Sequence, residues 1–127
     1  MPSNRGYPDL HEHLRTLEER GLLLTIDRPI DKDAEMHPLV RWQFVGGIEE
    51  HERKAFLYTN VIDGRGRKSD FPVVVGALAA NRAVYCAGML ADEADISARW
   101  ENAIANPIAP RIVTEALCQE VVIEGDA

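Results

Sequence analysis

The sequence predicts a small α/β domain in which a short mixed sheet is flanked by helices. Two observations carry this prediction. An amphipathic helical segment near the N-terminus leads at once into a short strand-like run, and further helical and strand-like segments then alternate along the chain. The 127 residues suffice for one domain, and 46% of them are apolar, which provides a hydrophobic core and excludes a disordered chain.

The first predicted helix begins after Asp9 and ends at Gly21. Asp9 is a favourable N-cap residue, and Glu12 three positions later completes a variant of the capping box. Gly21 is typical of a residue just beyond a helix C-terminus. The helix is amphipathic because three leucines share one face: Leu10, Leu14 and Leu17.

One predicted strand precedes a second predicted helix, and another strand follows it. The strands cover Leu22–Ile26 and Ala55–Val61, and the latter is rich in aromatic and β-branched residues. The helix between them begins at Asp31 or Asp33, either of which can cap it, and runs toward Phe44. Its core-facing residues are expected to be Met36, Leu39, Val40 and Phe44.

The third predicted strand, Phe71–Val75, follows a turn over Asp63–Lys68. Because this run carries no charged residue, we expect it to be buried on both faces, as a central strand is. The segment Ala77–Leu90 is small and apolar and is expected to be helical or mixed. A further helix is predicted over Asp92–Asn106, with Trp100 in its core-facing stripe.

The C-terminal part predicts an extended stretch at Pro107–Pro110 and then a strand over Cys118–Ile123. A strand at this place is expected either to lead into a further domain or to pair as an edge strand of the present one.

Composition excludes several classes of protein. The 14 basic and 21 acidic residues give a net charge of −7, which disfavours a nucleic-acid-binding protein. No apolar run is long enough to span a membrane, and the first residues lack the apolar core of a secretion signal. Two cysteines are too few for a disulfide scaffold and fit a reducing compartment, so we expect a cytoplasmic protein.

Histidines and cysteines are not predicted to form a reactive site. On a helix, His11 and His13 point about 200° apart, so they cannot share a metal ion and are expected to be solvated. His37 and His51 lack neighbouring ligands at the spacing of a zinc site. We expect the two cysteines, Cys86 and Cys118, to behave as small buried apolar residues.

The remaining candidates are a basic turn and Trp42. The turn Gly64–Lys68 could contact a phosphate or a carboxylate, although it is also typical of a solvated hairpin. No nucleotide-binding glycine motif is present. Trp42 is expected in the core or at an interface.

Taken in order, several short motifs resemble UbiD-type decarboxylases. The resemblance covers almost the whole chain, although each motif is weak alone. The motifs are Asp9–Leu23, Ile26–Asp31, Leu57–Val61 with the run Phe71–Gly76, Pro107–Pro110, and Cys118–Val122.

This resemblance implies a fold, a reaction and a cofactor. The family carries out non-oxidative decarboxylation of aromatic or unsaturated carboxylic acids with prenylated flavin mononucleotide, manganese and potassium. Its flavin domain, a split β-barrel that this chain is expected to lack, follows the N-terminal domain. We therefore expect residues 1–110 to be the N-terminal α/β domain and residues 111–127 to be a linker and first strand toward the flavin domain. No family catalytic, cofactor-binding or metal-binding residue maps onto a position of this sequence.

Three hypotheses follow for the function. The first is the N-terminal domain, or a truncated form, of a UbiD-like decarboxylase, structural rather than catalytic, which contacts the remainder of the chain and forms a homo-oligomer in the full-length protein. The second is a separately encoded small subunit that docks on a catalytic subunit. The third is an unrelated module that binds an anion through the turn Arg65–Lys68.

Overall fold

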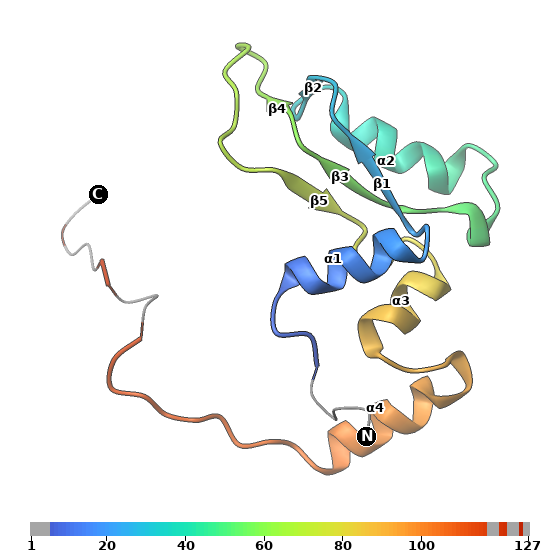
Figure 1. Cartoon of the computed structure of the whole chain (residues 1–127), viewed down its shortest axis with the longest axis vertical. Helices are drawn as coiled ribbons and strands as arrows, with labels where there is room; N and C mark the ends of the chain where they lie inside the picture. The colour runs from blue at the N-terminus through green and yellow to red at the C-terminus, as the bar shows by residue number, and fades with distance from the viewer. Residues whose placement is uncertain (1–5, 117–119, 122–124, 126–127) are drawn as a thin grey trace. The chain divides into compact units, whose positions relative to one another are not determined.

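The computed structural model describes residues 6–116, 120–121 and 125 of the chain (Figure 1). The chain forms two compact units, divided between Ser97 and Ala98. Every strand of the described residues lies in the first unit, together with three α-helices. None of the described helices is long and apolar enough to cross a bilayer.

Helix α1 (Leu10–Glu19) and strand β1 (Leu23–Ile26) confirm the predicted start of the domain. The carboxylate of Asp9 accepts a hydrogen bond from the backbone N–H of Glu12 at 3.0 Å and so caps the helix. Gly21 has a φ of +67°, a left-handed conformation that favours glycine, and it turns the chain from α1 into β1.

The central strand of the main sheet is β3 (Ala55–Tyr58). It pairs in parallel with β1 and antiparallel with β5 (Val73–Val75), so the sheet is mixed as predicted. The prediction of a central strand at Phe71–Val75 is wrong, because β5 lies at the edge and its residues are only partly buried. Its lack of charge reflects contact of Val73 and Val75 with the hydrophobic core on one face.

Two hydrophobic clusters lie on opposite faces of β3. Since strand residues alternate between faces, Ala55 contributes to one cluster, and Phe56 and Tyr58 contribute to the other. Ala55 packs with residues of α1 and α3 (Arg82–Met89). Phe56 and Tyr58 pack with residues of α2 (Met36–Val45), and Figure 1 shows α2 apart from α1 and α3. The sheet is therefore covered by helices on both faces.

A second, two-stranded parallel sheet was not predicted from the sequence. It joins β2 (Ile30–Asp31) to β4 (Val61–Ile62). The single strand expected over Ala55–Val61 is therefore two strands, separated by residues 59–60.

Helix α2 begins at Met36, later than the predicted start at Asp31 or Asp33. The carboxylate of Asp31 accepts hydrogen bonds from the N–H groups of Asp33 and Ala34, at 2.8 and 3.2 Å. These bonds hold residues 32–35 in a turn, so Asp31 shapes the approach to the helix and does not cap it.

Helix α2 directs Gln43 toward the core, whereas the sequence predicts that Phe44 faces the core. Gln43 is buried, its amide nitrogen donates to the carbonyl of Lys54 at 3.0 Å, and its oxygen accepts from the N–H of Lys54 at 2.9 Å. Phe44 is exposed instead, with the Arg53 guanidinium 5.2 Å from its ring centroid. The other expected core positions are confirmed, because these side chains join the cluster on β3: Met36, Leu39 and Val40.

The helix predicted over Asp92–Asn106 is present as a short 3₁₀ turn, η2 (Glu93–Asp95), followed by α4 (Ile96–Ala105). No residue of α4 is buried and Trp100 is about half exposed, so the expected core position of Trp100 is wrong. Residues 107–113 have no regular structure. The predicted strand Cys118–Ile123 falls largely outside the described residues.

Replacement of Gln43 by alanine tests the connection between α2 and β3. Because Gln43→Ala leaves both backbone groups of Lys54 without their side-chain partner, we expect the free energy of unfolding to fall by about 1–3 kcal/mol. Urea denaturation followed by circular dichroism measures the change. Arg41→Ala, at an exposed position of the same helix, is the control and is expected to stay within about 0.5 kcal/mol of the wild type. Equal effects of the two substitutions would contradict the proposed role.

Candidate functional site

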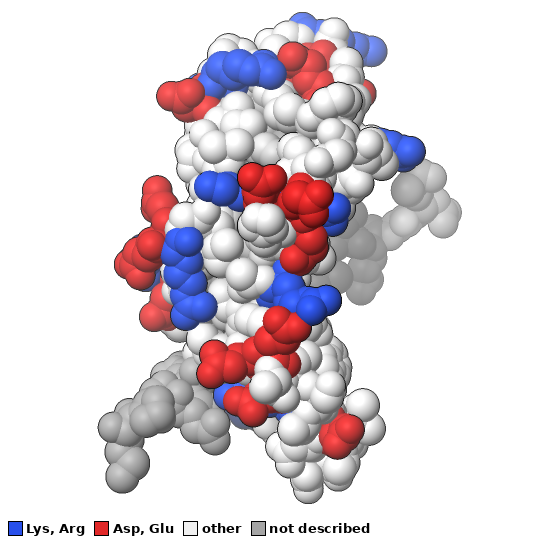
Figure 2. Space-filling model, turned by 90° about the vertical axis from the view of Figure 1, so that its right-hand side faces the viewer, with Lys and Arg blue, Asp and Glu red and all other residues white. Residues whose placement is uncertain are grey.

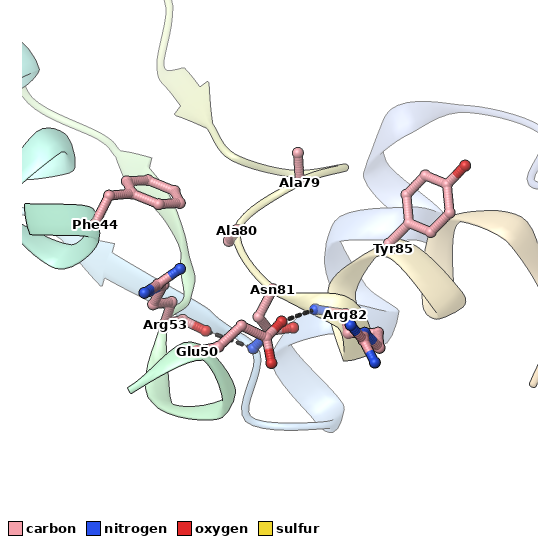
Figure 3. A pocket seen from close by; sticks show the side chains of 8 residues that line it. All are labelled: Phe44, Glu50, Arg53, Ala79, Ala80, Asn81, Arg82 and Tyr85. Carbon is pink, nitrogen blue, oxygen red and sulfur yellow. Dashed lines mark hydrogen bonds between the residues drawn. The ribbon is translucent and has the colours of Figure 1, made fainter. Parts of the chain in front are cut away.

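An open pocket of about 330 Å³ lies beside the N-terminal end of α3 (Figure 3). Its walls come from α2, from the 3₁₀ turn η1 (Glu50–Glu52) and the residue after it, and from the segment that enters α3. The lining residues are Phe44, Glu50, Arg53, Ala79, Ala80, Asn81, Arg82 and Tyr85.

Asn81 is the buried polar residue of this pocket. Its side-chain oxygen accepts a hydrogen bond from the N–H of Val84 at 2.7 Å, which caps α3, and its amide nitrogen donates to the carbonyl of Arg53 at 2.6 Å. One side chain therefore both starts the helix and attaches it to the residues that precede β3. The capping role of Asn81 is hidden in the sequence when Ala77–Leu90 is taken as one helical or mixed segment. An asparagine before a helical run was the available signal.

Glu50 binds a second backbone N–H group at the N-terminus of α3, beside the one capped by Asn81. Its carboxylate accepts a hydrogen bond from the backbone N–H of Arg82, the first residue of α3 (Figure 3). Negative charge is favoured at this place because the helix dipole and the unpaired N–H groups point toward it. The carboxylate thus takes a position where an anionic ligand could otherwise bind.

Both cationic side chains of the pocket are engaged within the protein. Arg53 stacks on Phe44, and its Nε donates to the carbonyl of Ile48 at 3.3 Å. Arg82 forms an ion pair with Glu93 at 2.6 Å, and the hydrogen bond that its guanidinium donates to the Glu93 carboxylate raises the pKa of Arg82. The lining therefore holds no nucleophile beside a base, and its arrangement serves packing more than acid–base chemistry.

The basic turn at Gly64–Lys68 is organised by an acidic residue. The carboxylate of Asp63 accepts hydrogen bonds from the N–H groups of Arg65 and Arg67, each at 2.9 Å, and pairs with the Arg67 guanidinium at 2.7 Å. The backbone N–H of Arg67 and then its side chain hold the pKa of Asp63 below its ordinary value. Since Arg67 is neutralised by Asp63, this geometry weakens the hypothesis of an anion site here.

Further carboxylates surround the same turn. Asp33 accepts a hydrogen bond from Lys32 at 2.6 Å and one from the N–H of Gly64 at 3.0 Å, and both lower the pKa of Asp33. The N–H of Asp31 likewise lowers the pKa of Glu35. An open pocket of about 290 Å³ beside this turn is lined by the acidic residue Asp63 as well as by three basic residues: Lys32, Arg67 and Lys68.

His13 is buried and not solvated, contrary to the expectation from the sequence. Its side chain is only 4% exposed, and its Nε2 lies 2.7 Å from the carbonyl oxygen of Ala77, which assigns the ring hydrogen to Nε2. The ring also lies 5.0 Å from that of Tyr7, whose hydroxyl donates to the carbonyl of Ala87. His13 therefore joins α1 to the segment before α3, whereas His11 is exposed as expected.

The other candidate residues do not come together. His37 and His51 are exposed, Trp42 is exposed and Cys86 is partly buried with a free thiol. Cys118 lies outside the described residues. Within the described part of the chain, no three histidine, cysteine, aspartate or glutamate side chains are grouped so that they could hold a metal ion.

Substitutions at Asn81 test its role as a helix cap. Because Asn81→Ala removes the acceptor for Val84, we expect the free energy of unfolding to fall by about 0.5–2 kcal/mol. Asn81→Ser keeps a capping oxygen and is expected to recover part of this loss. Thermal denaturation measures both variants. If serine is no better than alanine, capping is not what Asn81 contributes.

The hydrogen bonds to Asp63 predict a dependence of stability on pH. Folding lowers the pKa of Asp63 below its unfolded value of about 3.9, so its contribution is complete above about pH 5 and is lost as the pH falls through the folded-state pKa. We expect Asp63→Asn to lower stability at pH 7 and to flatten its decline between about pH 5 and pH 2.

Urea denaturation across this pH range is the measurement. Asp95→Asn, in the exposed turn η2, changes the net charge equally and is expected to keep the slope of the wild type. A wild-type slope in Asp63→Asn would contradict this account of the turn.

Comparison with known protein families gives one match. The family model described as the 3-octaprenyl-4-hydroxybenzoate carboxy-lyase N-terminal domain matches residues 14–103, which is more than half of the chain. The matched range extends from within α1 into α4 and includes both sheets. No curated protein and no solved structure matches the chain.

Proposed function

The chain belongs to the UbiD N-terminal domain family, and we propose that it is the N-terminal domain of a UbiD-like carboxy-lyase with a structural role. The complete enzyme would remove carbon dioxide from an aromatic or unsaturated carboxylic acid. The observation that carries this proposal is the family match over residues 14–103. The predicted resemblance to UbiD-type decarboxylases is thereby confirmed at the level of the family.

The described residues do not fit the cofactor set that the family implies, namely prenylated flavin mononucleotide with manganese and potassium. The N–H of Arg82 at the start of α3, where a phosphate could be bound, already donates to the carboxylate of Glu50. The described acidic and histidine residues also include no group suited to a divalent cation. We therefore assign the cofactor to the remainder of the enzyme and derive no catalytic step from this chain.

The role that we propose for this domain is to contact and support the flavin domain. That domain would be either a continuation of the same chain or a catalytic subunit encoded separately. Both arrangements use the same fold and differ only in whether the partner is covalently attached. A cytoplasmic location belongs to the same proposal, supported by the low number of cysteines, two in 127 residues.

The hypothesis of an unrelated anion-binding module receives less support. It depends on the positive charge of the turn Arg65–Lys68, and within this turn Arg67 is paired with Asp63. The family match adds a second reason to prefer the carboxy-lyase context.

An activity assay on the 127-residue chain tests the proposal. The purified chain is incubated with prenylated flavin mononucleotide, manganese, potassium and a panel of aromatic and unsaturated carboxylic acids, and released carbon dioxide is measured. We expect no turnover and no flavin absorbance retained after gel filtration, because the described residues offer no fitting site. A complete UbiD-type enzyme is the positive control. Turnover by the chain alone would overturn the proposed structural role.

A further inference from the structure

Helix α2 is apolar on two opposite sides. Its inward side packs on β3 through Met36, Leu39 and Val40. A second apolar stripe lies on the other side at the spacing i, i+4 and i+7, formed by three exposed residues that we call the outer face of α2: Pro38, Trp42 and Val45. Globular proteins usually place such two-sided apolar helices between two layers.

The polar residues of α2 support the same interpretation. Gln43 points inward and has both amide groups paired with Lys54, whereas Trp42 is 61% exposed and Val45 is 65% exposed. A helix that faced only water would be expected to place the glutamine outside and the tryptophan inside. Figure 2 views the side on which α2 lies in Figure 1, and shows uncharged surface in its upper part between groups of charged residues.

The indole of Trp42 is held in a defined position. A Cβ atom on Gly46 would lie 2.6 Å from the ring atom Cε2 of Trp42, so the indole rests directly against the glycine backbone. An aromatic side chain that is already ordered loses little conformational entropy when a partner covers it. Tryptophan is also among the residues that contribute most to binding at interfaces.

The area of the outer face indicates which kind of partner covers it. An aromatic side chain presents about 150–250 Å² when fully exposed, so Trp42, Val45 and Pro38 together offer roughly 300 Å². A stable dimer needs about 800 Å² from each partner, which excludes a second copy bound through this face alone. Contacts between domains of one protein bury as little as about 600 Å² in total, which is about 300 Å² from each domain. The outer face of α2 is therefore large enough to be one side of such a contact.

We propose that the outer face of α2 is the surface on which the next domain of the UbiD-like carboxy-lyase docks through an apolar patch of its own. This inference rests on the proposed function and adds to it the place of contact. Trp42 is the central anchor of the interface, and Val45 and Pro38 complete the covered stripe.

Photo-crosslinking in the protein's native cells tests the inference. The photoreactive residue p-benzoylphenylalanine replaces Val45, the cells are irradiated, and the cross-linked peptides are identified by mass spectrometry. We expect a cross-link to a UbiD-type flavin-domain sequence, either in the same chain or in an associated chain. Trp42→Ala in the same background is expected to lower the cross-linking yield about tenfold, as the loss of an anchor residue does. Phe71→Ala, at an exposed aromatic residue outside α2, is the control and should leave the yield unchanged.

Other outcomes would overturn the inference and can be told apart. A cross-link to α2 of a second copy, or to another part of these 127 residues, would assign the outer face to a different occupant. A flavin-domain sequence that accompanies the protein without a cross-link from position 45 would place the contact elsewhere and leave the proposed function intact. If no such sequence is attached to the protein or purifies with it, the proposed function itself fails. Circular dichroism of Trp42→Ala shows whether its fold is retained.

Discussion

Two side-chain amides hold the entry to the central strand, and the arrangement of the helices depends on them. Gln43 of α2 binds both backbone groups of Lys54, and Asn81 at the start of α3 donates to the carbonyl of Arg53. Arg53 and Lys54 directly precede β3, and the opposite faces of β3 carry the two hydrophobic clusters. Buried amides that are fully hydrogen-bonded specify position more strictly than apolar contact does, because any displacement leaves polar groups unpaired. The outer face of α2 and the pocket beside α3 are therefore both fixed relative to β3.

Capping and glycine signals in the sequence were sufficient to predict the start of the domain, α1 and the turn into β1. Asp9 with Glu12 gave the start of α1, Gly21 gave its end, and the small α/β class with a mixed sheet followed from the order of the segments. Strand order could not be predicted in the same way, because it depends on contacts between distant residues. Phe71–Val75 looked central since it lacks charge, yet β3 takes the centre by pairing on both sides.

The same limit applies to the candidate site. Hydrophobic periodicity predicts that Phe44 faces the core and assigns no position to Gln43, because the method ranks residues by hydropathy. It does not detect that the backbone of Lys54 offers Gln43 both a hydrogen-bond donor and an acceptor. His13 has the pattern of a solvated residue of the first helix, yet it is buried because the carbonyl of Ala77 and Gly88 of α3 lie against its ring. The family resemblance succeeded where these patterns failed, since it used the order of motifs along the chain.

The central proposal is that this domain of the UbiD N-terminal family provides shape and contact, while the chemistry occurs in its partner. The mass of the endogenous protein, captured from its native cells with an antibody to this domain, tests that claim most directly. We expect either a chain several times heavier than 14.2 kDa that includes a flavin domain, or a chain of 14.2 kDa bound to a UbiD-type catalytic chain. A 14.2 kDa protein recovered without any such catalytic sequence would contradict the account.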